Sequence, residues 1–189
     1  MKHITTIALI LNLSVAAVYA NEKPVKMAFS GTSSPNAINL QYPNTSNDED
    51  NFAGKGTLGS FTLRNERALE NSPTTPPPSS CSGANQLYLR EPGGGGIFRF
   101  EDGSLLYLHL TEGADCIDLA TNSAHCTVGF KITGGTGRFK DASGVLTLTE
   151  TVVTVLSDAL ENPVFFGATG EFTGTISGIS EVQDGDEGQ

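Results

Sequence analysis

The amino-acid sequence predicts an all-β domain that closes into an eight-stranded antiparallel barrel. Short runs of alternating apolar and polar residues recur along the chain, and no stretch shows the period of a long helix. Glycine, asparagine, aspartate and proline separate these runs at short intervals. Closing the runs into a barrel removes the exposed edges that an open sheet would leave. A two-sheet sandwich is the alternative architecture.

The predicted strands follow one another with mostly short connections. They cover residues 25–30, 52–64, 86–90, 95–101, 104–112, 126–133, 144–156 and 164–179. The clearest connection is Asp102-Gly103, because this dipeptide tolerates the positive φ angles of a tight hairpin turn. We therefore expect a hairpin between the fourth and fifth predicted strands.

Two polar segments are predicted to be surface loops. Residues 42–51 are polar and acidic, and residues 71–83 are rich in proline and hold no large apolar side chain. The acidic tail, 181–189, has the composition of a disordered segment. Between the termini, residues 21–180 are long enough to form one domain with a substantial core.

Residues 1–20 have the pattern of a Sec-type signal peptide. A short polar start precedes an apolar run, and small residues stand before a cleavage position at Asn21. A membrane anchor is the alternative, but the apolar run is shorter than the ~20 residues that a spanning helix needs. We expect a secreted or periplasmic protein that keeps no membrane attachment once the signal is cleaved.

The charge balance argues against a nucleic-acid partner. The sequence has a formal net charge of −10, and cleavage would remove Lys2 and no acidic residue. A chain this acidic repels nucleic acid and anionic lipid. The excess of acidic residues is explained by solubility.

Export makes a disulfide possible, and the sequence has three cysteines. We predict a Cys116–Cys126 bond, because these residues flank a short turn, and we expect Cys81 to be free. Pairing of Cys81 with either of the others is the alternative, since spacing does not determine connectivity. A zinc site of Cys116, His125 and Cys126 lacks the usual ligand spacing, so we predict no metal and no cofactor.

The glycine-rich segment ITGGTGRFKDASG, residues 132–144, raises the possibility of a phosphate-binding loop. Its spacing matches neither the P-loop nor the dinucleotide fingerprint, and the β-branched residues after it do not predict the helix that both motifs require. We instead interpret Gly134, Gly135 and Gly137 as a corner between strands. A similar Thr-Gly-charged-Phe theme at Gly170 is interpreted as a second turn.

These two segments, GGTGRFKDASGVL and GATGEFTGTISG, resemble the C-terminal half of the allene oxide cyclase and dirigent superfamily. The resemblance covers residues 128–178, is consistent with the hairpin at 95–112, and is closest to the exported proteins that share this barrel. It implies a calycin-like, eight-stranded antiparallel barrel with an apolar cavity, and a trimeric homo-oligomer. Dirigent proteins orient phenoxy radicals during coupling, whereas allene oxide cyclases close a fatty-acid epoxide into a ring. No functional residue of either group has a matching motif here.

The alternation of residues gives three candidate ligand-binding residues. Tyr107 and His109 share one face of their strand, and they either face solvent or line the mouth of a cavity. Glu150 stands on an otherwise apolar face. We place it at the barrel rim, in water or paired with Arg99 or Arg138. The alternative points Glu150 inward, where burial would raise the pKa of its carboxyl group.

The sequence is most consistent with a binding or scaffold protein that holds a small apolar molecule or provides a stable surface. It contains no nucleophile elbow and no zinc-protease motif, so enzymatic activity is not the preferred interpretation. A cyclase or isomerase that confines a reactive substrate is the first alternative. A structural surface protein is the second.

Overall fold

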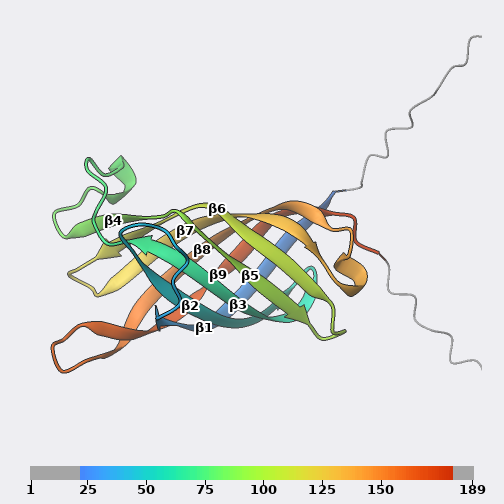
Figure 1. Ribbon diagram of the computed structural model, residues 1–189, viewed down its shortest axis with the longest axis horizontal. Helices are drawn as coiled ribbons and strands as arrows, with labels where there is room; N and C mark the ends of the chain where they lie inside the picture. Colours follow the sequence, from blue (N-terminus) through green and yellow to red (C-terminus); the bar gives the residue numbers. More distant parts are fainter. Residues whose placement is uncertain (1–21, 181–189) are drawn as a thin grey trace, which may run out of the picture.

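The computed structural model describes residues 22–180, which form nine β-strands and two single-turn 3₁₀ helices (Figure 1). In chain order these are β1 (Lys23–Asn36), β2 (Thr45–Gly56), β3 (Gly59–Glu70), η1 (Ser79–Cys81), β4 (Gln86–Glu91), β5 (Gly93–Phe100), β6 (Leu105–Asp118), β7 (Ser123–Gly135), η2 (Gly137–Phe139), β8 (Ser143–Ser157) and β9 (Pro163–Ser177). The predicted signal peptide and acidic tail lie outside the described residues.

The described strands close into an antiparallel barrel. The sheet runs from β6 through β5, β3, β2, β1, β9 and β8 to β7, and β7 pairs again with β6. Strands β4 and β5 pair with successive parts of the same edge of β6, and the register continues without a shift from one to the other. It runs from Gln86 opposite Asp118 to Arg99 opposite Leu105. They therefore share one position, and the predicted eight-stranded closed barrel is confirmed in preference to the sandwich.

The prediction for residues 42–64 is wrong in two places. The expected strand at 52–64 is a hairpin that turns at Thr57 and Leu58, and most of the expected loop at 42–51 belongs to β2. This part of β2 is polar although it belongs to a strand, because its inward-facing residues are Asp48 and Asp50. They lie on the same face of the strand as the buried Phe52. Each of these side chains points into the barrel, and Asp50 is fully buried.

One half of the barrel is filled by aromatic side chains. Phe29 stacks on Phe52 at 4.4 Å between ring centroids, and Phe61 meets Phe98 edge-on at 4.9 Å. Phe139, the last residue of η2, is fully buried, and Gly137 at the start of η2 adopts a positive φ of 56° that glycine tolerates without strain. The Arg138 guanidinium closes this end by covering the Phe139 ring at 4.5 Å and donating to the Leu58 carbonyl.

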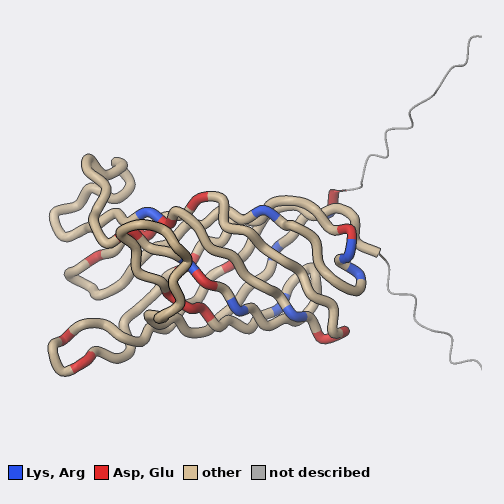
Figure 2. The backbone as a smooth tube through the Cα atoms, viewed as in Figure 1, with Lys and Arg blue, Asp and Glu red and all other residues tan. Residues whose placement is uncertain are grey.

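The opposite end of the barrel carries the loops 37–44, 71–85, 119–122 and 158–162 (left in Figure 1). None of these loops contains lysine or arginine, and Figure 2 shows that the charges they carry are acidic. Within residues 22–180, no helix is long and apolar enough to cross a membrane. We refer to this end as the open end and to the aromatic end as the closed end.

A bulge in β6 changes which of its residues face the interior. Leu110 pairs with Phe130 and Glu112 with Gly129, which leaves Thr111 without a partner in β7. Leu106, Leu108 and Leu110 are buried before the bulge, whereas Asp115 is buried after it. The inward face therefore switches from even to odd residue numbers at Thr111.

This switch explains why the predicted Cys116–Cys126 disulfide is wrong. Cys126 pairs with Asp115 and, like Asp115, points into the barrel, so Cys116 lies on the outer face. Cys116 instead bonds to Cys81, which the proline-rich loop carries to the outside of the barrel. All three cysteines lie in the described part of the chain, and Cys126 remains a buried free thiol.

A cavity with a charged floor as the candidate functional site

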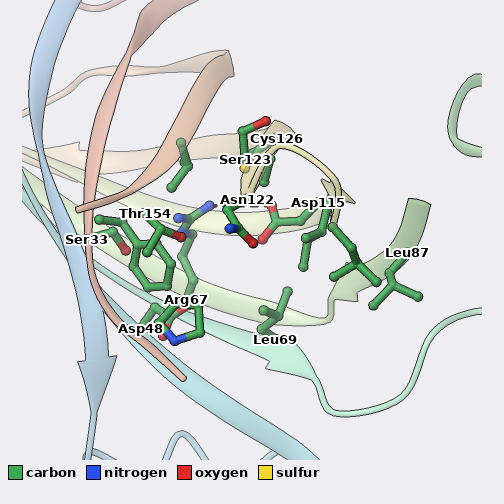
Figure 3. Close-up of a pocket in the computed structure, with 16 residues that line it drawn as sticks. Ser33, Asp48, Arg67, Leu69, Leu87, Asp115, Asn122, Ser123, Cys126 and Thr154 are labelled. Atoms are coloured by element: carbon green, nitrogen blue, oxygen red, sulfur yellow. Dashed lines mark ion pairs between the residues drawn. The ribbon is translucent and has the colours of Figure 1, made fainter. Parts of the chain in front are cut away.

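The open half of the barrel contains a cavity of about 310 Å³ (Figure 3). It lies between the inner faces of the strands and the loops at the open end. Its apolar wall is formed by Leu69, Leu87, Ile117, Leu119, Ala124, Val152, Pro163 and Phe166. Its polar lining is formed by Ser33, Asp48, Arg67, Asp115, Asn122, Ser123, Cys126 and Thr154. A pocket with apolar walls and a few converging polar groups is the usual form of a small-molecule site.

Arg67 is the centre of the cavity floor. It lies on β3, where the inward alternation runs from Leu63 through Asn65 to Arg67, and it is 4% exposed. Its Nε lies 2.8 Å from Asp50 Oδ2, and its Nη2 donates to Asp50 Oδ1 at 3.1 Å. Asn65 Nδ2 donates to Asp50 Oδ2 at 2.9 Å, which fixes the carboxylate from the other side.

Three further carboxyl groups approach the same guanidinium. Arg67 Nη1 donates to Glu91 Oε1 at 2.8 Å and lies 3.1 Å from Glu150 Oε1. Asp115 Oδ1 is 4.0 Å from Nη1, which is the limit of an ion pair. These three groups come from β4, β8 and β6, whereas Asp50 comes from β2.

The cluster holds more acidic groups than its single positive charge can neutralise. With Asp48, five carboxyl groups surround one guanidinium within the described structure. Burial would lower the pKa of Arg67, but the surrounding carboxylates raise it well above its ordinary value, so Arg67 stays charged. The excess carboxyl groups must therefore either take up protons or remain as uncompensated negative charge.

The pKa values show which groups take up protons. Burial raises the pKa of Glu150 to about 7 and that of Asp48 to about 6, against the opposing effect of Arg67. Burial also raises the pKa of Glu91 well above its ordinary value, and the nearby Asp115 carboxylate adds to this effect. Cys126, beside Asp115 and Glu150, has a raised pKa for the same principal reason and is a neutral thiol.

Several oxygen atoms of the cluster lack a hydrogen-bond partner. They include Asp115 Oδ1, Glu91 Oε2 and both carboxyl oxygens of Glu150. Of these residues, Asp115 lines the cavity, and Figure 3 shows the Arg67 side chain between Asp48 and Asp115. Asp48 and Asp115 are therefore the carboxyl residues of the cluster that a molecule in the cavity can contact.

The structure separates the three predicted ligand-binding residues. Tyr107 and His109 lie on the outer face of β6, where His109 is exposed, and neither lines the cavity. Glu150 lies inside the barrel at 5% exposure and pairs with Arg67, so its expected place at the rim with Arg99 or Arg138 is wrong. The inward alternative for Glu150 is the one observed.

The predicted turn glycines also fall into two groups. Gly134, Gly135 and Gly137 lie at the corner between β7 and η2, as expected. Gly170 is not in a turn: it lies within β9, between Glu150 of β8 and Phe29 of β1. A Cβ at this position would be 2.2 Å from the Thr149 carbonyl oxygen, so Gly170 permits close strand pairing.

The sequence analysis did not identify Asp48, Asp50, Arg67, Glu91 or Asp115 as site residues. A usable signal was present in β3, where the alternation of Phe61 and Leu63 continues through Asn65 and Arg67. A polar residue in register with buried apolar residues is a candidate interior group. Among the described residues, no three His, Cys, Asp or Glu side chains are placed to hold a metal ion.

No protein-family model matches the chain, and no curated protein matches it. Among solved structures, the chain is similar to the pterocarpan synthase dirigent protein GePTS1. The two sequences are 11% identical, and the alignment covers 90% of this chain and 99% of that one, with a TM-score of 0.39. The strand pairings of the chain itself establish the closed barrel.

Proposed function

We propose that this chain is an exported barrel that binds a small, mostly apolar molecule in the cavity at its open end. The observation that carries the proposal is the contrast between the two halves of the barrel. The closed half is filled by phenylalanine rings, whereas the open half leaves about 310 Å³ between apolar walls and a charged floor. A barrel that acted only as a rigid scaffold would gain stability by filling this space.

The cost of the charged floor supports the same conclusion. Buried ion clusters are often no more stable than apolar residues of similar volume, and unpaired carboxyl oxygens add a further penalty. Arg67, Asp115 and Glu150 therefore contribute less to stability than an apolar filling would. A ligand that offers hydrogen-bond donors to the floor would offset this penalty.

Export is supported by the N-terminal sequence pattern and by the Cys81–Cys116 disulfide. Disulfides persist in oxidising compartments such as the periplasm and the extracellular space. Detection of a mature N-terminus at Asn21 in the extracellular or periplasmic fraction tests this part of the proposal. An uncleaved chain that remains in the cytosol would contradict it.

The binding proposal is tested with N-phenylnaphthylamine, a neutral dye whose fluorescence rises in apolar surroundings. Ala124→Leu adds volume to the cavity wall, whereas Ala53→Leu makes the same change at an exposed outer position. We expect the wild type and Ala53→Leu to bind the dye equally, and Ala124→Leu to bind about tenfold more weakly. Equal binding by all three proteins would place the dye elsewhere and contradict the proposal.

A second candidate function is a cyclase or isomerase, and it rests on Asp48. This residue lines the cavity, and its pKa of about 6 lets it hold and release a proton near neutral pH. A bound molecule whose reactive atom reaches Asp48 could therefore undergo proton transfer in a dry, confined space. Conversion of a co-purified ligand by wild type but not by Asp48→Asn would support this function, and equal conversion by both would exclude it.

A further inference from the structure

We propose that the preferred ligand is an organic cation, namely an apolar molecule that ends in a protonated amine bound by Asp115 and Asp48. The proposal rests on the binding function above and names its ligand class. Its starting point is the excess of carboxyl groups over positive charge at the cavity floor. The charged and titratable groups of that floor are Asp48 and Asp50 on β2, Arg67 on β3, Glu91 on β4, Asp115 on β6, Cys126 on β7 and Glu150 on β8.

Arg67 is not free to bind an anionic ligand. Its Nε and Nη2 face Asp50, and its Nη1 faces Glu91 and Glu150, all within 3.1 Å. A ligand carboxylate at the floor would therefore compete with carboxylates that are already in place. It would also lie beside Asp115 and Asp48, where like charges repel at short range.

Asp115 is the acceptor that lacks a partner. It is 7% exposed, it lines the cavity, and its Oδ1 has no hydrogen bond in the described structure. The Oδ1 atom lies 4.0 Å from Arg67 Nη1, so Arg67 compensates this carboxylate only weakly, and 11% of the Asp115 side chain remains exposed to contact a donor from the cavity. A protonated amine supplies both the donor and the positive charge that the cluster lacks.

The walls and the opening of the cavity determine which kind of ligand body can accompany the amine. Leu69, Ile117 and Phe166 provide an apolar surface for a hydrocarbon or aromatic body, and the limited volume excludes large ligands. The loops around the opening carry no basic residue, so they do not repel a cation. The absence of a three-ligand metal cluster among the described residues argues against a metal ion as the cation.

The test compares phenylbutylamine, phenylbutanol and phenylbutyrate by isothermal titration calorimetry at pH 8. The three probes share one apolar body and differ in the charge of the polar group. We expect the amine to bind about tenfold more tightly than the alcohol, and the carboxylate to bind most weakly. Equal binding of all three would overturn the cation proposal and leave cavity binding intact, whereas failure of all three to bind would contradict both.

Two isosteric variants test which carboxylates bind the amine of the ligand. Asp115→Asn and Asp48→Asn should each weaken amine binding about tenfold while leaving alcohol binding within about twofold of wild type. Asp48 is less deeply buried than Asp115, so Asp48→Asn provides a measurement if the other variant does not fold. Glu171→Gln, on the outer face of β9, is the matched control. Unchanged amine affinity in every folded variant would overturn the proposal.

The pH dependence gives an independent measurement. Asp48 and Glu150 lose their protons between about pH 5 and pH 8, whereas an alkylamine stays protonated up to about pH 10. Affinity for the amine should therefore rise across this range, and affinity for the alcohol should remain nearly constant. An amine affinity that is constant or falls would contradict the assignment.

Discussion

Arg67 and Asp50 face each other inside the barrel through two nitrogen–oxygen contacts of 2.8 and 3.1 Å. Asp50 is fully buried and Arg67 is 4% exposed, and Asp50 is held from its other side by Asn65. This pair is the fixed part of the cavity floor. Around this pair, Asp48 and Glu150 can exchange protons near neutral pH, because burial raises their pKa values to about 6 and about 7.

Replacing Arg67 with Met should destabilise the protein strongly. The change leaves Asp50, Glu91 and Glu150 buried without their counter-charge, a loss of about 3–5 kcal/mol in the free energy of unfolding at pH 7. The loss should be smaller at pH 5, because protonation removes part of the repulsion. Urea unfolding followed by circular dichroism measures both values.

Arg64→Met on the same strand is the control for this prediction. The Arg64 side chain is 62% exposed and pairs with Glu49 and Glu66 at the surface, so its loss should cost less than about 1 kcal/mol. If the two variants lost the same free energy of unfolding, the buried ion pairs of Arg67 would contribute no more to stability than the surface ion pairs of Arg64.

The protein should become less stable as the pH rises from about 4 to 7. Burial raises the pKa of Asp48 to about 6 and that of Glu150 to about 7, whereas both groups titrate near pH 4 in the unfolded chain. The folded state therefore binds more protons in this interval, and raising the pH favours unfolding. Above the folded-state pKa values, this contribution should level off.

Glu150→Gln should flatten this decline, because it removes one of the shifted groups. Thermal unfolding midpoints measured from pH 5 to pH 8 give the change of the midpoint with pH for the wild type and for the variant. Glu171→Gln, which changes an outer-face carboxylate, should keep the wild-type slope. A wild-type midpoint that rises over this interval would refute the predicted sign.

The thiol content of the native protein should match the observed Cys81–Cys116 bond. Cys126 is 3% exposed and burial raises its pKa, so it should react with a thiol reagent only after unfolding. We expect no fast-reacting thiol in the native state and one thiol in denaturant without reductant. Three thiols under the same conditions would show that the disulfide does not form.

Removing the disulfide should lower stability by about 3–4 kcal/mol, given a sequence separation of 35 residues. Cys116→Ser combined with Cys81→Ser tests this in urea unfolding. The same measurement on Cys126→Ser separates loss of the bond from loss of a buried thiol. A double variant as stable as wild type would show that the proline-rich loop needs no covalent attachment.

Gly170→Ala should destabilise the barrel by about 1–3 kcal/mol, because the added methyl group would overlap the Thr149 carbonyl oxygen. Gly167→Ala on the same strand is the control. Its added carbon would lie 3.4 Å from the Val155 side chain, which is an ordinary contact. Urea unfolding of both variants measures the difference, and equal stability would contradict the close strand approach at Gly170.

The fold was predictable from the sequence because hydrophobic alternation determines which strands exist. The burial of Leu106, Leu108 and Leu110 follows directly from that alternation. The bulge at Thr111 was not predictable, because it depends on pairing with β7 and not on local composition. The bulge places Cys116 on the outer face while Cys126 points inward, so the two cysteines that flank the turn are not bonded to each other.

The candidate site was harder to predict because its residues break the rule used to find strands. Asp48 and Asp50 make part of β2 resemble a loop, and Arg67 resembles a surface residue. Their inward direction becomes clear only when β2 and β3 are aligned as a hairpin. The buried carboxyl groups need the positive charge of Arg67 between them. Asp50, Glu91 and Glu150 lie on different strands, so they meet at Arg67 only when the barrel is closed.

The pairing of β1 with β9 has a consequence for the order in which the chain can fold. Lys23 lies opposite Ile176, so the first strand finds one of its two neighbours only when the last strand is present. A growing chain that has not yet reached β9 has unpaired edges on both β1 and β8. Barrel closure therefore comes after synthesis of nearly the whole domain, which is the behaviour of a chain dominated by distant contacts.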